Sequence, residues 1–174
     1  MADIPIPTIS LQSLDSSAHR SDSVRAIGQA LEQSGFFIVE NHGISPEQIA
    51  DCYRVAETFF TLPEQTKLAY HRPELKGQRG FTEFGREHAK DNTQPDLKEF
   101  FQIGREGSES LPPNIWPSEP REFCEVIGRL YRQLEGIGMA LLDACSEHLG
   151  LETDHLPRLA EGSDSILRVI HYPP

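Results

Sequence analysis

The stretch GFFIVENHGI, residues 35–44, decides how the rest of the chain is interpreted. Its Phe36–Glu40 run is short and rich in aromatic and β-branched residues, which predicts a buried strand. Gly35 stands where a helix would end in a left-handed carboxyl cap, and Asn41–Gly43 has the residues of a tight turn. The stretch therefore predicts the end of one helix, then a strand, then a turn.

Helices are predicted on both sides of this strand. Before it, Val24 and Ile27 begin an apolar series at helical spacing, which predicts a helix over residues 21–34. After it, a second helix is predicted to begin at Ser45, because Pro46 suits the first helical position. The strand is thus expected to lie between two amphipathic helices.

The rest of the pattern predicts short strands and one long helix, which is an α+β fold. The other predicted strands are residues 4–11, 80–84, 97–103 and 165–172. The long helix covers residues 119–149, and Leu134 lies in the middle of its apolar face, where we expect it to be buried. Gly136 and Gly138 interrupt this helix at a cost of about 1 kcal/mol each relative to alanine. We therefore expect a strand or helix to approach them closely.

The last predicted strand, residues 165–172, has no later segment with which to pair. It is apolar and β-prone, and Arg168 is the one charge in its centre. Open strand edges pair with whatever chain is available. We therefore expect this strand to be poorly ordered, or ordered only through another molecule, and the domain to be incomplete.

Charge and hydropathy exclude several classes of function. A net charge of −11 argues against nucleic acid and anionic membranes as partners, because phosphate binding requires a basic surface. The longest apolar run, Phe36–Val39, is far shorter than the about 20 residues that span a bilayer, and no secretory signal is visible. Cys52, Cys124 and Cys145 are an odd set without paired short spacing, which favours reduced thiols in the cytoplasm.

A search for metal and nucleophile motifs finds none in the sequence. A non-haem Fe(II) site needs two histidines and a carboxylate, and on a strand His-x-Asp places two of these ligands on one face. None of the seven histidines has an acid two residues later. We therefore expect no catalytic residue and no metal ligand in this chain. His42 is predicted to bond to the backbone of its turn, and His171 to be structural.

Several motifs follow one another in a fixed order along the chain. After GFFIVENHGI come RGF at residues 79–81, DLKEFF at 96–101, WP at 116–117 and LRVIHYPP at 167–174. This series resembles the isopenicillin-N-synthase-like 2-oxoglutarate/Fe(II)-dependent dioxygenases. The resemblance covers essentially the whole chain, and it matches only the amino-terminal half of those enzymes.

The resemblance implies a domain and its chemistry. Residues 1–174 would be the amino-terminal dioxygenase domain, with a long helix that buttresses the fold. Residues 165–174 would form the first strand leading into a catalytic jelly roll, which the chain lacks. The full-length parent would use Fe(II) and 2-oxoglutarate to hydroxylate, desaturate or cyclise a small-molecule substrate. The family's iron ligands follow the Tyr-Pro-Pro segment, so this chain alone is expected to bind no cofactor and to be inactive.

Four residues match positions near the family's active site. By this resemblance Tyr172 and Arg168 are candidates for binding the cofactor 2-oxoglutarate, although Arg168 could equally be a strand arginine paired with an acid. Arg79 and Phe81 match a loop that lines the substrate entrance, and an arginine there suits a carboxylate. A plain surface arginine is the alternative for Arg79. The alternative for the whole chain is a non-catalytic binding module that uses an exposed sheet edge.

Overall fold

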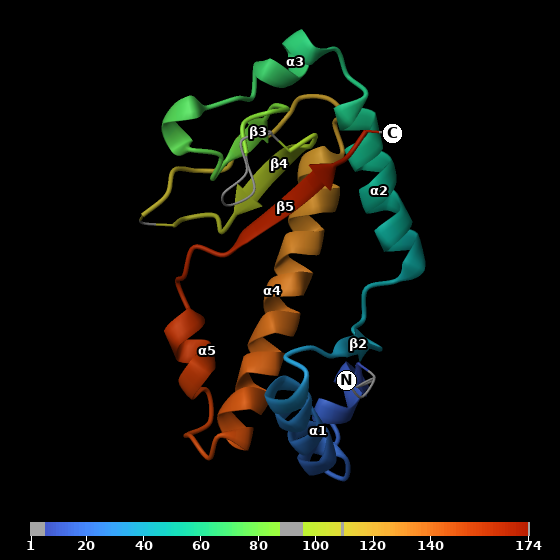
Figure 1. Ribbon diagram of the computed structural model, residues 1–174, viewed down its shortest axis with the longest axis vertical. Coiled ribbons are helices and arrows are strands. Elements are labelled where there is room, and N and C mark those ends of the chain that lie inside the picture. Colours follow the sequence, from blue (N-terminus) through green and yellow to red (C-terminus); the bar gives the residue numbers. More distant parts are fainter. Residues whose placement is uncertain (1–5, 88–95, 109, 174) are drawn as a thin grey trace. The chain divides into compact units, whose positions relative to one another are not determined.

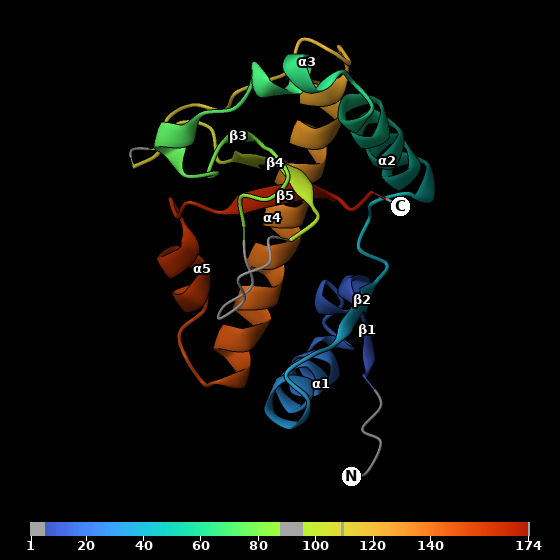
Figure 2. The ribbon, with the colours of Figure 1, turned by 45° about the horizontal axis from the view of Figure 1, so that its top comes forward.

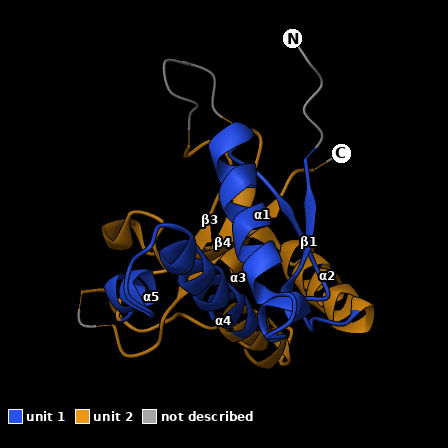
Figure 3. Ribbon diagram, turned by 90° about the horizontal axis from the view of Figure 1, so that it is seen from below, with its two compact units in different colours: residues 1–45, 133–161 blue, residues 46–132, 162–174 orange. Residues whose placement is uncertain are grey.

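The computed structural model of the 174-residue chain describes residues 6–87, 96–108 and 110–173 (Figure 1). The chain forms two compact units (Figure 3). Unit 1 comprises Met1–Ser45 and Gln133–Glu161, and unit 2 comprises Pro46–Arg132 and Gly162–Pro174. The long helix α4, Phe123–His148, contributes its first part to unit 2 and the rest to unit 1.

Unit 2 contains a three-stranded antiparallel sheet in the order β3-β4-β5 (Figure 1). The strands are β3 at Gly80–Thr82, β4 at Glu99–Gly104 and β5 at Ile166–His171. Phe101 of β4 lies opposite Phe81 on one side and Val169 on the other. Because side chains in register share a face, these three residues define the face of the sheet that meets the core.

The core of unit 2 lies between that face, helix α2 (Pro46–Phe60) and the beginning of α4. Phe59 is fully buried at its centre, with its ring centroid 5.0 Å from Phe101 and 5.4 Å from Phe123 in tilted or edge-on arrangements. Such aromatic pairs stabilise a core beyond the area that they bury. The short helices α3 (Glu64–Leu68) and η2 (Pro73–Leu75) connect α2 to β3.

Unit 1 is built around helix α1, Arg20–Gln33, and the second part of α4. Strands β1 (Thr8–Ser10) and β2 (Ile38–Glu40) form a two-stranded parallel sheet beside α1 (Figure 2). The turn η1 (Leu11–Leu14) joins β1 to α1, and helix α5 (His155–Ala160) follows α4. The buried members of its core are Ile9, Leu14, Val24, Ile27 and Ala144.

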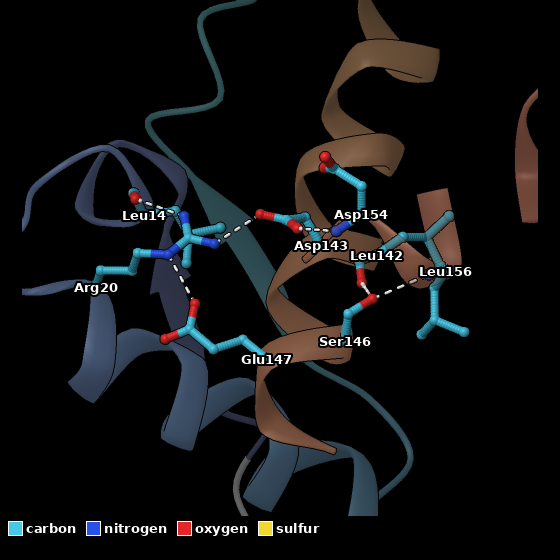
Figure 4. A network of polar contacts seen from close by, with 8 residues as sticks. All are labelled: Leu14, Arg20, Leu142, Asp143, Ser146, Glu147, Asp154 and Leu156. Carbon is cyan, nitrogen blue, oxygen red and sulfur yellow. Dashed lines mark hydrogen bonds and ion pairs between the residues drawn. The ribbon is translucent and has the colours of Figure 1, made fainter. Parts of the chain in front are cut away.

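Arg20 ties the start of α1 to α4 within unit 1 (Figure 4). Its guanidinium donates to Asp143 at 2.7 Å, to Glu147 at 2.8 Å and to the carbonyl oxygen of Leu14 at 2.9 Å. These bonds raise the pKa of Arg20, first through Glu147 and then through Asp143, against the opposing effect of burial. Ser146 Oγ accepts the backbone N–H of Leu156 at 3.0 Å, which fixes the beginning of α5.

The predicted α+β class is confirmed: short strands in two small sheets are combined with one long helix, and the described strands close no barrel. Gly35 has the left-handed φ of +76° predicted for a helix cap. The predicted burial of the strand in this stretch is wrong, because Phe36 is 68% and Ile38 53% exposed. Of this apolar run only Phe37 packs against the core of unit 1. Helix α5 was not predicted, because its six residues are too few to show a helical period.

Two expectations for α4 are wrong. Leu134 is 42% exposed, because the core of unit 2 takes α4 residues up to Tyr131 and the core of unit 1 takes them from Leu141. Leu134 comes between these two sets of residues in the sequence of α4 and is a member of neither core. A Cβ built at Gly136 or Gly138 would meet no described atom within 4 Å outside the neighbouring backbone of α4, so no other described strand or helix approaches these glycines closely.

The expectation that the last strand lacks order within this chain is also wrong. Strand β5 pairs with β4 along its full length, from Glu99 opposite His171 to Gly104 opposite Ile166. Its partner β4 precedes it in the sequence, so β5 pairs without any later segment. Among the described residues its other edge carries no strand. No helix in the described ranges is long and apolar enough to cross a membrane.

Candidate functional site

The β3-β4-β5 sheet has two faces of different character. One is the core face, with Phe81, Phe101 and Val169. The opposite face, called the polar face below, carries Thr82, Phe100, Gln102, Gly104, Ile166, Arg168 and Ile170. All the cofactor-binding residues predicted from the sequence belong to β5 or follow it directly.

Arg168 stands on the polar face and is held by two contacts. Its guanidinium carbon lies 4.3 Å from the centroid of the Phe100 ring, and its Nη1 donates to Glu87 Oε2 at 3.0 Å. Tyr172 takes the next position of the same alternation, just past β5, and is 65% exposed. The acid-paired alternative for Arg168 is what the structure shows. Binding of 2-oxoglutarate by Arg168 and Tyr172 stays a prediction.

The two predicted substrate-binding residues are both buried, on opposite faces. Phe81 is 1% exposed, and its ring packs edge-on against Phe59 at 6.0 Å on the core face. Arg79 is 0% exposed, so the surface-arginine alternative is wrong. Its guanidinium lies against Gly104 on the polar face, where a built Cβ would be 2.4 Å from Nη1. The bare glycine thus makes room for the arginine, and the substrate role of both residues stays a prediction.

The polar face also holds buried polar atoms that lack a partner within the described ranges. They are Arg79 Nε and Nη2, Thr82 Oγ1 and Gln102 Oε1. Buried polar groups in native proteins are nearly always hydrogen-bonded, so these atoms require an explanation. Sequence reasoning missed Thr82 and Gln102. The signal was available in the alternation of β4, where Gln102 stands between Phe101 and Ile103.

A carboxylate lies close to this face. Asp164, just before β5, accepts hydrogen bonds from Ser108 Oγ at 2.5 Å and from Ser110 Oγ. These two bonds lower the pKa of Asp164 below its ordinary value, and the positive charges of Arg79 and Arg105 act in the same direction. Asp164 is exposed, and both its oxygens are engaged by serine hydroxyls.

A buried ionic network fixes the end of β5 from the other side. Lys67 Nζ donates to both oxygens of Glu99, at 2.9 and 2.6 Å, and to the carbonyl oxygen of Phe60 at 3.0 Å. His171, the register partner of Glu99, places Nδ1 2.9 Å from Glu99 Oε1 and stacks its ring on Phe60. Lys67 is 7% and Glu99 2% exposed. His171 is therefore structural, as predicted.

The remaining candidates also have structural roles. The backbone N–H of Ile44 donates to His42 Nδ1 at 3.2 Å, as predicted for a turn histidine. The three cysteines are free thiols, and burial raises the pKa of Cys52 and of Cys145, which makes them weaker nucleophiles. In the part of the chain that the structure describes, no group of three or more His, Cys, Asp or Glu side chains could hold a metal ion.

Comparison with known proteins identifies the region to which this fold belongs. The family model described as "non-haem dioxygenase in morphine synthesis N-terminal" matches residues 6–119. Over 168 residues the chain is 30% identical to naringenin,2-oxoglutarate 3-dioxygenase of Hordeum vulgare, covering 97% of this chain and 44% of that protein. Over 180 residues it is 31% identical to gibberellin 20 oxidase 2 of Arabidopsis thaliana, covering 99% and 47%. A solved 2OG-Fe(II) oxygenase family protein from Caulobacter crescentus superposes with a TM-score of 0.84 at 31% identity, covering 97% of this chain and 56% of that one.

The fold is that of the amino-terminal region of non-haem dioxygenases. The chain belongs to the 2-oxoglutarate/Fe(II)-dependent dioxygenase family, as its motif series predicted. It spans about half the length of the curated relatives that it matches. The family uses Fe(II) and 2-oxoglutarate, and the described residues of this chain contain no group of side chains that could hold a metal ion.

Proposed function

We propose that residues 1–174 are the amino-terminal domain of a 2-oxoglutarate/Fe(II)-dependent oxidoreductase that hydroxylates, desaturates or cyclises a small molecule. In this proposal β5 leads into a carboxyl-terminal jelly roll, and the polar face forms part of the wall of the active-site cavity. The observation that carries the proposal is the alternation on β5, which puts Arg168 and Tyr172 on the side away from the core.

The proposed roles follow from the contacts of these residues. The hydroxyl of Tyr172 would donate to a carboxylate oxygen of 2-oxoglutarate. The guanidinium of Arg168 is already positioned by Phe100 and Glu87, so it would present a fixed charge to the cofactor or substrate. The Arg79 guanidinium would interact with the substrate at the polar face, and Phe81 would support the sheet from the core face.

The described residues do not fit an Fe(II) site by themselves. In the proposed enzyme the iron ligands therefore belong to the carboxyl-terminal jelly roll, and this chain alone is inactive. The three free cysteines support a reducing, cytoplasmic location.

Turnover of 2-oxoglutarate to succinate tests the proposal. The chain would be joined to the carboxyl-terminal part of the Caulobacter crescentus oxygenase and compared with the chain alone. We expect turnover only in the joined protein. Tyr172→Phe should weaken 2-oxoglutarate binding about tenfold, since a hydrogen bond to a charged group contributes about 1.5–3 kcal/mol. Phe84→Leu, at another partly exposed aromatic residue of unit 2, serves as the control. A folded joined protein without turnover, or turnover by the chain alone, would contradict the proposal.

The second candidate function is a non-catalytic interaction module. The observation that favours it is the edge of β5 opposite β4, which carries no strand among the described residues. Such an edge can add a strand from a partner. Sedimentation velocity over a hundredfold concentration range would show self-association if the edge is used in this way. A monomer at every concentration would contradict the interaction module, and the enzyme would be the one remaining proposal.

A further inference from the structure

The β1-β2 sheet of unit 1 has an exposed apolar outer face. Ile9 and Phe37 pack against the core of unit 1. The side chains on the other side of the alternation are open to solvent: Ile6 is 52%, Phe36 68% and Ile38 53% exposed. Because β1 and β2 pair in parallel register beside α1, these three side chains share one face of the sheet (Figure 2). They are called the outer patch below.

The parallel pairing indicates that this face is normally covered. Parallel sheets occur in proteins almost only with both faces packed against other elements. The core of unit 1 covers one face of the β1-β2 pair, and no described residue buries the other. Single exposed apolar side chains are common on protein surfaces, whereas several together mark an interaction site.

The composition of the second strand leads to the same conclusion. The run Phe36–Glu40 is rich in aromatic and β-branched residues, as buried strands are, and yet Phe36 and Ile38 are exposed in this chain. The composition and the exposure agree if a further segment covers the strand in the complete enzyme.

The relatives of this chain contain such a segment. The matches cover 97% and 99% of this chain, but only 44% of the Hordeum vulgare dioxygenase and 47% of the Arabidopsis thaliana oxidase. Each of those proteins therefore contains about as much chain again as the part that is matched. A region of that size is large enough to cover one face of a two-stranded sheet.

A second copy of this chain is the less favourable occupant. Each copy carries a net charge of −11, so association of two copies brings like charges together. Glu40 is exposed on the same face as Ile38. A twofold interface joins the same patch of both copies, so it would also bring the two Glu40 carboxylates into one interface.

We propose that the outer patch is the surface on which the carboxyl-terminal part of the enzyme packs, with apolar side chains of that part covering Ile6, Phe36 and Ile38. The inference rests on the proposed function in taking the covering part to be the carboxyl-terminal region of a dioxygenase. It adds an interface in unit 1 that is distinct from β5 and the polar face, which belong to unit 2. The stretch GFFIVENHGI then serves the assembly of the enzyme.

Two variants test this interface. Phe36→Ser/Ile38→Thr removes most of the apolar patch, and threonine keeps the β-branched shape that suits a strand. Tyr53→Ser is the matched control, because Tyr53 is a 75% exposed aromatic residue on α2 in unit 2. Serine and tyrosine have similar helix propensities, so the control should not disturb α2.

The 174-residue chain alone should have an open patch. Hydroxyl radicals should oxidise Phe36 and Ile38 at roughly half their rates in the unfolded chain, in keeping with exposed fractions of 68% and 53%. Both variants should leave the Tm of the chain within about 2 °C of wild type, since exposed side chains contribute little to stability. Protection of the two residues that grows with chain concentration would identify a second copy as the occupant and overturn the inference. Strong protection at every concentration would show that the chain covers the patch by itself, and would also overturn it.

The chain joined to the carboxyl-terminal part of the Caulobacter crescentus oxygenase should have a covered patch. Oxidation of Phe36 and Ile38 should be slower by at least about fivefold than in the chain alone, because the centre of an interface is fully buried, and oxidation of Tyr53 should stay within about twofold. Phe36→Ser/Ile38→Thr should lower the Tm of the joined protein by at least about 5 °C, and Tyr53→Ser by no more than about 2 °C. Unchanged oxidation of Phe36 and Ile38 in a joined protein that turns over 2-oxoglutarate would overturn the inference and leave the proposed function intact. Protection in a folded joined protein without turnover would contradict the proposed function and support the interface.

Discussion

Replacing Lys67 with methionine would leave the carboxylate of Glu99 buried without its main counter-charge. The Glu99 side chain is 2% exposed and the Lys67 side chain 8%, and both carboxylate oxygens lie within 2.9 Å of Nζ. Removing one partner of a buried ion pair costs about 3–5 kcal/mol, because the other charge remains desolvated. His171 Nδ1 still lies 2.9 Å from Oε1 and offsets part of this loss. We therefore expect Lys67→Met to lower the free energy of unfolding by about 3 kcal/mol, at the lower end of that range.

Urea unfolding of the purified chain, followed by circular dichroism, measures this loss. Arg158→Met serves as the control, because the Arg158–Glu152 pair is exposed at 57% and 86% and such pairs contribute about 0–1 kcal/mol. The double variant Lys67→Met/Glu99→Leu should recover most of the stability, since an apolar pair of similar volume is often as stable as a buried ion pair. A loss below about 1 kcal/mol for Lys67→Met would show that Glu99 is solvated. The claim that Lys67 and Glu99 form a buried ion pair would then be wrong.

Three further predictions concern stability. Gly28→Ala should destabilise the chain by about 1–3 kcal/mol in a urea titration, because the new Cβ would lie 2.1 Å from the His148 ring. Gly136→Ala should stabilise it by up to about 1 kcal/mol, because no described atom outside the neighbouring backbone of α4 lies near the new Cβ. A Gly28→Ala chain more stable than the Gly136→Ala chain would contradict the packing. The folded pKa of Asp164 is lowered, so its contribution is present above its ordinary value of 3.8 and is lost as the pH falls below it. Asp164→Asn should therefore flatten the acid side of the stability profile, and an unchanged profile would refute this. Leu134→Ala should cost under about 1 kcal/mol because the side chain is 42% exposed, and a loss above about 2 kcal/mol would mean that it is buried in solution.

The sequence predicted local structure well because local structure depends on near neighbours. The helix cap predicted at Gly35 and the alternation predicted for β5 are confirmed, since a helix cap and a strand each extend over a few residues. Leu134 was misplaced because a helical period shows which side of a helix is apolar, and does not show where along the helix a core ends.

The candidate site was only partly predictable, because it depends on pairings across the chain. The motif series picked out Arg79 and Arg168, but burial of Arg79 depends on Gly104, which lies on β4 and is distant from Arg79 in the sequence. Glu99 meets Lys67 from 32 residues away and His171 from 72. The helical and strand periods of a sequence do not predict contacts between residues so far apart in the chain. The register of β4 and β5 brings Glu99 and His171 together, and helix α3 brings Lys67 to them.

Anaerobic titration with Fe(II) and 2-oxoglutarate tests the central claim most directly, by the metal-to-ligand charge-transfer absorption of the bound pair. For the chain alone, whose described residues offer no metal-binding group, we expect no such band. The chain joined to the carboxyl-terminal part of the Caulobacter crescentus oxygenase should give a band that saturates at one equivalent of each component. A stoichiometric band from the chain alone, or none from the folded joined protein, would contradict its assignment as the amino-terminal domain of a 2-oxoglutarate/Fe(II)-dependent dioxygenase.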